Sequence, residues 1–554
     1  MSIVTNDYRT VLERTGFDSW YHSLPPKLGI DQFRTVLPTM VAGDGGEATV
    51  VAKEIDRTNL EAIGAAGPRF VFHTPYFTFD RVESPTDAAP DLPSAVAGLV
   101  DGRAELDPRM SVSLYDELAA RLPGSSRMRR PAFVPPLNCY RVPRAAVDEL
   151  ARPAREAALP AARLYLEEIG NAKRAEPWLV RPPVGALATL DRLMAAAGVD
   201  AVLASTPVNV QGLTGVPGSL LGQDTWALYE RESADVVLLA RRELPWLGLP
   251  EASPFAGPGL SALYGGTVGY EELDLSREAF DGLGLAERGT PASRLLRRWR
   301  EVSSWEDLSF YVLGAQVTVR AIEAALGVVR DAVRRGEAVD ELAAYTRYRA
   351  VVADEISSRK LPIRVRTYFT HTHAGSRSLI PARATEYPLL PLTSLKIDAG
   401  LEIYDAGGSL RAASDVTRSA LGSQSALDAY ELFDRVLVED VIDACRPGRT
   451  GDEVFQSGAA ALEPHHGELA GAGLCPDDGV PFRDAIGRDI GHLLGKQEPA
   501  TVVFQRDNTE VFEPGMLAAA ELQWPYHDHC IGVEDVFMTT EEEPLNLTRG
   551  SREG

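Results

Sequence analysis

The chain has 554 residues, a formal charge of −23 and 45% hydrophobic residues. A chain of this length divides into roughly three domains, and its acidic balance argues against nucleic acid as a partner, because phosphate binding needs clustered Lys and Arg. Four cysteines without a CxxC pair indicate neither a disulfide framework nor a zinc ribbon, which predicts a cytoplasmic protein. The start lacks a signal peptide, and no uncharged apolar segment approaches the roughly 20 residues of a membrane span, so we expect no membrane partner.

A local pattern occurs twice in the first 300 residues. Residues 187–197 predict a helix that stops at Gly198 and leads into the strand VDAVLA, and near Gly16 the segments TVLERT and FDSWYH follow the same order. Strand-like ATVVAKE and SADVVLLARRE come later in the respective copies. The pattern favours an internal duplication of an α/β domain. The alternative is two unrelated α/β segments that share a common local pattern.

Two proline-rich stretches, PAFVPP at 131–136 and PWLVRPP at 177–183, interrupt regular structure. We therefore expect a first domain over residues 1–150 and a second over 176–300. A third domain is expected over 301–554. It begins at Ser303-Ser304-Trp305-Glu306, which resembles a capping box, and continues as a long helix with one apolar stripe that ends at Gly336.

The segment SLKIDAGLEIYDAGGSLRAASDVTRSA, residues 394–420, holds two strand-like stretches around a glycine-bearing turn. A hairpin here would bring Asp398 and Asp415 close together. Facing carboxylates repel each other unless a proton or a cation lies between them. Taken alone, such a pair is more often two solvated turn residues.

Five motifs in order point to a family: IDAG, SDVTRS, DIGHLLG, EPGMLAAAEL and GVEDVFMTT. They resemble the creatinase, prolidase, aminopeptidase P and methionine aminopeptidase family in order and spacing. The resemblance is specific over 301–554, weaker over 176–300 and faintest over 1–175. It implies an α/β (α+β) chain with a C-terminal pita-bread catalytic domain behind two creatinase-type α/β domains, a layout similar to three-domain aminopeptidases P.

The resemblance also implies a metal site. Asp415 and Glu534 would bridge two divalent ions, Asp398 would complete one site, and His492 and Glu521 the other. Four carboxylates would neutralise two such ions, and a shared water could then lose a proton. Manganese or iron suits these ligands best, with cobalt or zinc as alternatives. Each residue alone is as well explained as a core histidine or a solvated acid, but together they are costly to bury without metal.

The chain departs from the family at three auxiliary histidines. Pro381 stands near the first expected place, Arg488 precedes His492 where a second is expected, and Glu498 and Pro499 stand near the third. Strand alternation places Phe369, His371 and His373 on one face. His371, His373 and Arg488 are therefore the catalytic candidates, with surface or structural roles as the alternative. His527 and His529 fall between the two ligand glutamates and are further candidates.

The leading hypothesis is a metal-dependent hydrolase that acts on a C–N bond of a small peptide or amino-acid derivative. The alternatives are a biosynthetic metalloenzyme on the same fold that does not cleave peptides, and a catalytically silent binding protein. We expect a small-molecule or short-peptide substrate and a homodimer. Proline-specific cleavage is in doubt, because the missing histidines would hold the substrate carbonyl and transfer protons.

Overall fold

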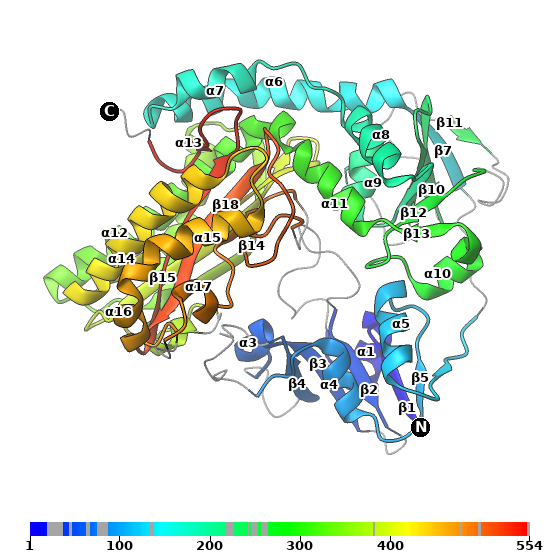
Figure 1. The fold of residues 1–554 in the computed structure, drawn as a ribbon, viewed down its shortest axis with the longest axis horizontal. Coiled ribbons are helices and arrows are strands. Elements are labelled where there is room, and N and C mark those ends of the chain that lie inside the picture. The colour runs from blue at the N-terminus through cyan, green and yellow to red at the C-terminus, as the bar shows by residue number, and fades with distance from the viewer. Residues whose placement is uncertain are drawn as a thin grey trace.

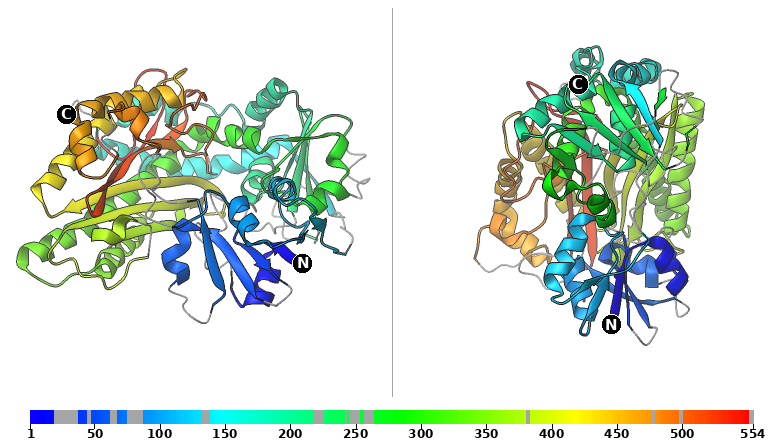
Figure 2. Two further views of the ribbon diagram at one scale, coloured as in Figure 1. Left: turned by 60° about the horizontal axis from the view of Figure 1, so that its bottom comes forward. Right: turned by 90° about the vertical axis from the view of Figure 1, so that its right-hand side faces the viewer.

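The structure is a computed structural model that describes residues 1–18, 37–43, 47–61, 67–74, 87–131, 138–217, 225–241, 243–244, 253–255, 264–379, 383–475, 479–496 and 500–550. The strands form three sheets, one in each of three bodies that follow one another along the chain (Figures 1 and 2). The result is a mixed α/β chain, as the sequence predicts.

The first sheet has the strand order β4-β3-β2-β1-β5-β6 and is flanked by short helices. Its core is apolar, with Val4, Val51 and Leu118 fully buried. The strands are β1 (Ser2–Thr5), β2 (Thr39–Ala42), β3 (Ala48–Lys53), β4 (Arg69–His73), β5 (Ala104–Leu106) and β6 (Ser126–Arg127), and the helices are α1 (Tyr8–Thr15), α3 (Arg57–Glu61), α4 (Leu92–Leu99) and α5 (Val112–Arg121).

The second sheet has the order β11-β7-β10-β9-β8-β12-β13. Its strands are β7 (Asn138–Pro143), β8 (Ala201–Ala204), β9 (Thr225–Glu230), β10 (Asp235–Ala240), β11 (Ser253–Phe255), β12 (Val268–Tyr270) and β13 (Gly289–Pro291), with α8 (Ala186–Ala197), α9 (Pro207–Thr214) and α10 (Arg277–Gly282) beside them.

The two N-terminal sheets share their order over five strands, which confirms the duplication expected from the sequence. In the first sheet β1, β2 and β3 form an antiparallel meander, and β5 and β6 extend it in parallel on the other side of β1. Strands β8, β9, β10, β12 and β13 repeat this arrangement. The predicted strands ATVVAKE and SADVVLLARRE become β3 and β10, which occupy equivalent positions.

The register expected for the repeat was wrong. The helix that ends at Gly16 follows the first strand of its copy, whereas the helix that ends at Gly198 precedes β8. The counterpart of Gly16 is Gly215, which ends α9 in the same left-handed conformation. Glycine stops occur at many helix ends, so the local pattern did not define the register. Most of FDSWYH lies outside the described residues.

The boundary expected at residue 150 also differs from the structure. Strand β7 pairs with β10 and so belongs to the second sheet. It leads directly into the long helix α6 (Arg144–Glu168), which is followed by α7 (Ala172–Leu179). These helices cross from the second body to the third (Figure 1). Buried residues of α6 and α7, including Tyr165 and Trp178, belong to the core of the third body.

The third body contains the sheet β14-β15-β16-β19-β18-β17, with β20 paired to β19. Its strands are β14 (Ile363–Ala374), β15 (Ser394–Asp405), β16 (Leu410–Leu421), β17 (Gly491–Leu493), β18 (Leu517–Tyr526), β19 (His529–Met538) and β20 (Leu545–Asn546). Its α-helices are α11 (Ser293–Val302), α12 (Leu308–Arg335), α13 (Glu341–Ser358), α14 (Gln424–Val436), α15 (Gly451–Leu462), α16 (His466–Gly471) and α17 (Phe482–Ala485).

The predicted long helix is α12, which packs against β15, β16, α13 and α6 and ends at Gly336. Its start differs from the expected capping box. The hydroxyl of Ser303 donates to the carbonyl of Trp299 and that of Ser304 to the carbonyl of Glu301, because α11 immediately precedes them. Residues 304–335 are long and apolar enough to cross a membrane, but 72% of the relevant window is buried inside the protein, as in a core helix.

Candidate metal centre

Three of the predicted ligands lie in one row across adjacent strands of the third sheet. A row of directly opposite residues crosses the sheet in the order His371, Asp398, Thr417, Glu534 and Glu521. Directly paired residues of antiparallel strands share one face of the sheet. The three acids of this row therefore point to the same side, and all three are buried.

The two remaining predicted ligands join this face. Asp415 lies two positions before Thr417, and His492 pairs with Ala519, two positions before Glu521. Asp415, His492 and Glu534 each offer a ligand atom, and these atoms all lie within 4.8 Å of one another. The Nε2 atom of His492 is 3.9 Å from Oδ2 of Asp415. Oxygen and imidazole donors this close fit a divalent ion such as manganese, iron or zinc.

Asp398 and Glu521 are held instead by side chains of the protein. The Lys396 ammonium lies 3.8 Å from Oδ2 of Asp398, and a guanidinium nitrogen of Arg488 lies 3.5 Å from Oε2 of Glu521. The amide nitrogen of Gln523 donates to Glu521 over 2.8 Å and approaches Oε2 of Glu534 at 3.4 Å. Gln523 thus links the two glutamates.

A second row of residues on the same face explains how Lys396 reaches this site. His373, Lys396, Ser419, Gly532 and Gln523 succeed one another across the sheet. The Lys396 ammonium donates to the side-chain amide oxygen of Gln523 over 2.8 Å. A Cβ at Gly532 would lie 3.2 Å from Cδ of Lys396 and 2.8 Å from Thr417. Glycine at this position therefore leaves the space through which the lysine chain runs.

Two of the buried carboxyl groups, those of Glu534 and Asp398, have a raised pKa. Burial and then the nearby Glu521 and Asp398 raise the pKa of Glu534 well above its usual value. Burial also raises the pKa of Asp398, and Lys396 and Arg488 offset part of that rise. A cation bound among these oxygens would relieve the repulsion. The alternative view of Glu534 as part of a solvated strand end is wrong, because Glu534 is 1% exposed.

Of the three catalytic candidates, His371 lies beside Asp398 in the row, and Arg488 contacts Glu521. His373 lies farther along, opposite Lys396, and is fully buried. The predicted alternation is confirmed, since the rings of Phe369 and His371 stack at 5.2 Å and those of His371 and His373 lie 5.5 Å apart. Burial and the charge of Lys396 lower the pKa of His371 to about 3, so its ring is neutral at pH 7.

The other two histidine candidates lie away from the site. His527 is in the turn between β18 and β19, and His529 is the first residue of β19. His529 precedes Glu534 by five positions, or about 17 Å along an extended strand. Their position in the sequence between two predicted ligands suggested a place in the site. The hairpin turn that carries them lies at the end of β18 and β19 away from the ligands. Pro381, Glu498 and Pro499 lie outside the described residues.

Residues 314–541 match metallopeptidase family M24. This range contains all five predicted ligands, and the C-terminal part of the chain is a domain of this family. None of the curated proteins matches the chain.

Solved structures share the pita-bread fold and part of the N-terminal region. The N-terminal domain of the FACT complex subunit SPT16 from chickpea (Cicer arietinum) is 12% identical, with a TM-score of 0.50 over 66% of this chain and 96% of that one. The prolidase from Pyrococcus horikoshii is 17% identical, with a TM-score of 0.48 over 66% and 99%. An X-Pro aminopeptidase from Thermotoga maritima is 15% identical, with a TM-score of 0.47 over 66% of this chain and 98% of that one.

Sequence reasoning missed Lys396 and Gln523, although a signal was present. Each lies two positions from a predicted ligand, Asp398 or Glu521, on a predicted strand. The same alternation that groups Phe369, His371 and His373 places both side chains on the ligand face. Gly532, two positions before Glu534, follows from the same rule.

Proposed function

We propose that this protein is a metal-dependent hydrolase that acts on a C–N bond of a small peptide or amino-acid derivative. The cluster of Asp415, His492 and Glu534 in a family M24 domain carries this proposal. The cluster combines buried acids with a histidine that keeps 17% of its side chain exposed, so a substrate can reach it.

Asp415, His492 and Glu534 would hold the first divalent ion. When bound, such an ion polarises a substrate carbonyl and lowers the pKa of a bound water. The family resemblance implied two ion sites, one completed by Asp398 and the other by His492 and Glu521. Lys396 and Arg488 already offset part of the negative charge of the site, so fewer metal ions are needed to neutralise the rest. We therefore propose one tightly bound ion, and a second only where these cations move away.

Side chains around the cluster supply the remaining steps of the proposed reaction. Neutral His371 lies on the cluster face beside Asp398, where its ring can form a hydrogen bond with a bound substrate. The planar fork of Arg488 can bind a substrate carboxylate in exchange for its long contact with Glu521. These roles suit a small anionic substrate. We also propose, from the sequence alone, that the protein is cytoplasmic and forms a homodimer.

One observation favours a second candidate function. The Lys396 ammonium and the Gln523 amide occupy hydrogen-bonding positions on Asp398, Glu521 and Glu534. A domain whose acids are satisfied by its own side chains can keep its shape without metal. This arrangement supports either a chemistry other than peptide hydrolysis or a silent binding protein.

Metal analysis and turnover separate these functions. We expect protein loaded with manganese and then dialysed to retain about one ion per chain, measured by mass spectrometry of the metal. Xaa-Pro dipeptides and tripeptides should turn over about 100-fold to 10,000-fold below the usual peptidase range, because proton-transfer groups are missing. Folded protein that retains no ion would overturn the hydrolase proposal. Xaa-Pro turnover of roughly 1 to 1,000 per second would instead identify an ordinary proline peptidase.

A further inference from the structure

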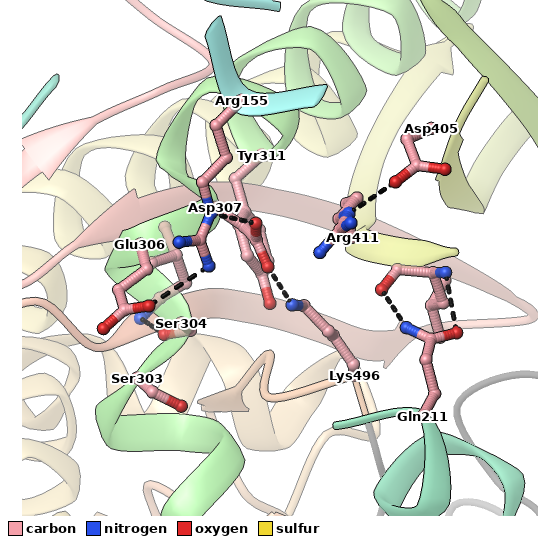
Figure 3. A network of polar contacts seen from close by, with 12 residues as sticks. Arg155, Gln211, Ser303, Ser304, Glu306, Asp307, Tyr311, Asp405, Arg411 and Lys496 are labelled. Carbon is pink, nitrogen blue, oxygen red and sulfur yellow. Dashed lines mark hydrogen bonds and ion pairs between the residues drawn. The ribbon is translucent and has the colours of Figure 1, made fainter. Parts of the chain in front are cut away.

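A polar cavity lies where the second body meets the third, away from the metal centre. Five segments of the chain line it, and each contributes one or more charged or amide side chains (Figure 3). These are Arg155 of α6, Gln211 of α9, Arg300 of α11, Glu306 and Asp307 before α12, Arg411 of β16 and Lys496 after β17.

Three of the four cations in this cavity have carboxylate partners. Arg155 donates to Asp307 over 3.0 Å and to Glu306 over 3.1 Å. The Lys496 ammonium binds the other oxygen of Asp307, and Nε of Arg411 donates to Asp405 over 2.7 Å. Figure 3 shows Asp307 between Arg155 and Lys496, with Arg411 beside them.

Among the described residues, no carboxylate lies within ion-pair distance of the fourth cation, Arg300. It is 8% exposed, and within the described part of the chain its Nε atom has no hydrogen-bond partner. Its guanidinium lies 4.8 Å from the ring of Trp299 and against Gly212, where a Cβ would overlap it. A buried guanidinium that no carboxylate contacts is costly, so its retention indicates a counter-ion from outside the chain. Burial and the neighbouring cations support this, since they lower the pKa of Lys496 to about 8 despite Asp307.

The cavity is small and its walls are held in place. Its volume is about 50 Å³, room for roughly three or four waters or one oxyanion of similar size. The Gln211 side chain donates to the carbonyl of Leu410 and accepts from its amide, which ties α9 to β16. Arg155 ties α6 to the start of α12 in the same way. The cations are therefore positioned before any ligand arrives.

We propose that this cavity is a binding site for a small oxyanion of the phosphate class, with Arg300, Arg411 and Lys496 as its ligands. Arg411 precedes Asp415 by four positions on β16, about 13 Å along the strand, so the site is distinct from the metal centre. Because the cavity lies among α6, α9, α11 and β16, a bound anion would join the second body to the third.

Isothermal titration calorimetry of the full chain with inorganic phosphate tests the proposal, at constant ionic strength and with chelator present. We expect one site per chain and a dissociation constant below about 1 mM, with sulfate similar and acetate weaker. Arg300→Met and Lys496→Met should each weaken phosphate binding at least 10-fold. Arg359→Gln is the matched control, because it removes one positive charge near the far end of α6, where Arg359 contacts Glu168. This variant should bind phosphate as tightly as the wild type.

A second measurement covers the case of a misfolded variant. Without phosphate, Arg300→Met should keep or raise the melting temperature, because it removes a buried charge that has no partner. A lowered melting temperature would mean that Arg300 stabilises the fold by itself and would overturn the proposal. Phosphate binding no tighter than chloride, or equal binding by wild type and both variants, would also overturn it. Binding that appears only when metal is present would assign the phosphate to the metal centre.

Discussion

The metal centre and the oxyanion cavity are both buried clusters with unbalanced charge, but of opposite sign. At the candidate metal centre, the carboxylates outnumber the cations Lys396 and Arg488, so negative charge remains. In the cavity, every cation except Arg300 has a carboxylate partner, and one positive charge remains. Since buried charge is costly without compensation, each cluster identifies the kind of ion that would complete it.

The two clusters also differ in how the chain assembles them. The metal ligands follow strand alternation across one sheet, so neighbouring positions in the pattern are neighbours in space. The polar side chains that line the cavity come from five separate segments of the chain, and no local sequence pattern relates these segments. A site built on one sheet can therefore be predicted from periodicity, whereas a site built between bodies cannot.

Removing a metal ligand should separate the two clusters most clearly. We expect His492→Ala to weaken manganese binding by at least the roughly 100-fold that loss of a supporting group can cost, and to abolish any hydrolysis. Phosphate binding in the cavity should be unaffected. Metal analysis and calorimetry on the same preparation check both outcomes. His527→Asn is the control, because this exposed turn residue lies away from the site. Equal metal retention by both variants would contradict the ligand assignment.

Lys396→Met should make the metal centre depend on metal for stability. The change leaves Asp398 buried without its cation, which typically costs about 3 to 5 kcal/mol in the free energy of unfolding. Manganese should restore the loss, and the variant should hold two ions per chain. Denaturant unfolding with and without manganese, together with metal analysis, measures this. A variant that is equally stable without metal would show that Lys396 does not offset the acidic charge.

Gly212→Ala should disturb only the cavity. The new Cβ would overlap the Arg300 guanidinium and lie 2.9 Å from the Trp299 ring, so we expect a loss of about 1 to 3 kcal/mol in stability from overpacking and weaker phosphate binding. Manganese retention should not change. Gly98→Ala in α4, where a Cβ would meet nothing within 4 Å, is the matched control. A fully stable Gly212→Ala protein would mean that Arg300 is free to move.

The smallest expected effect is a pH dependence. Lys496 is protonated below its pKa of about 8, and Asp307, Arg300 and Arg411 are the charged groups around it. Phosphate affinity should therefore be highest below pH 8 and fall as the pH rises above it, because the ammonium is lost. Calorimetry from pH 7 to 9.5 measures this fall most directly with sulfate, whose charge is constant over this range, and Lys496→Met should remove it. An affinity that rises with pH in the wild type would contradict the placement of Lys496 in the site.

The predicted elements show where sequence patterns succeed and where they fail. The stop of α12 at Gly336 and the strands β3, β10, β15 and β16 followed from periodicity and glycine. The start of α12 did not, because α11 lies directly before it and redirects Ser303 and Ser304 to its own carbonyls. This leaves Glu306 and Asp307 to bind Arg155, a contact between residues 151 positions or more apart.

The acidic face of the third sheet could be predicted from the sequence, because side chains alternate along strands and the motifs place Asp398, Asp415, Glu521 and Glu534 on strands. The sequence also indicated a duplicated α/β unit. The tertiary structure alone decided that Lys396 reaches Gln523 over Gly532, that β7 joins the second sheet, and that Arg300 is left without a carboxylate. Those outcomes depend on which chain segments meet, and the meeting of distant segments leaves no periodic trace in the sequence.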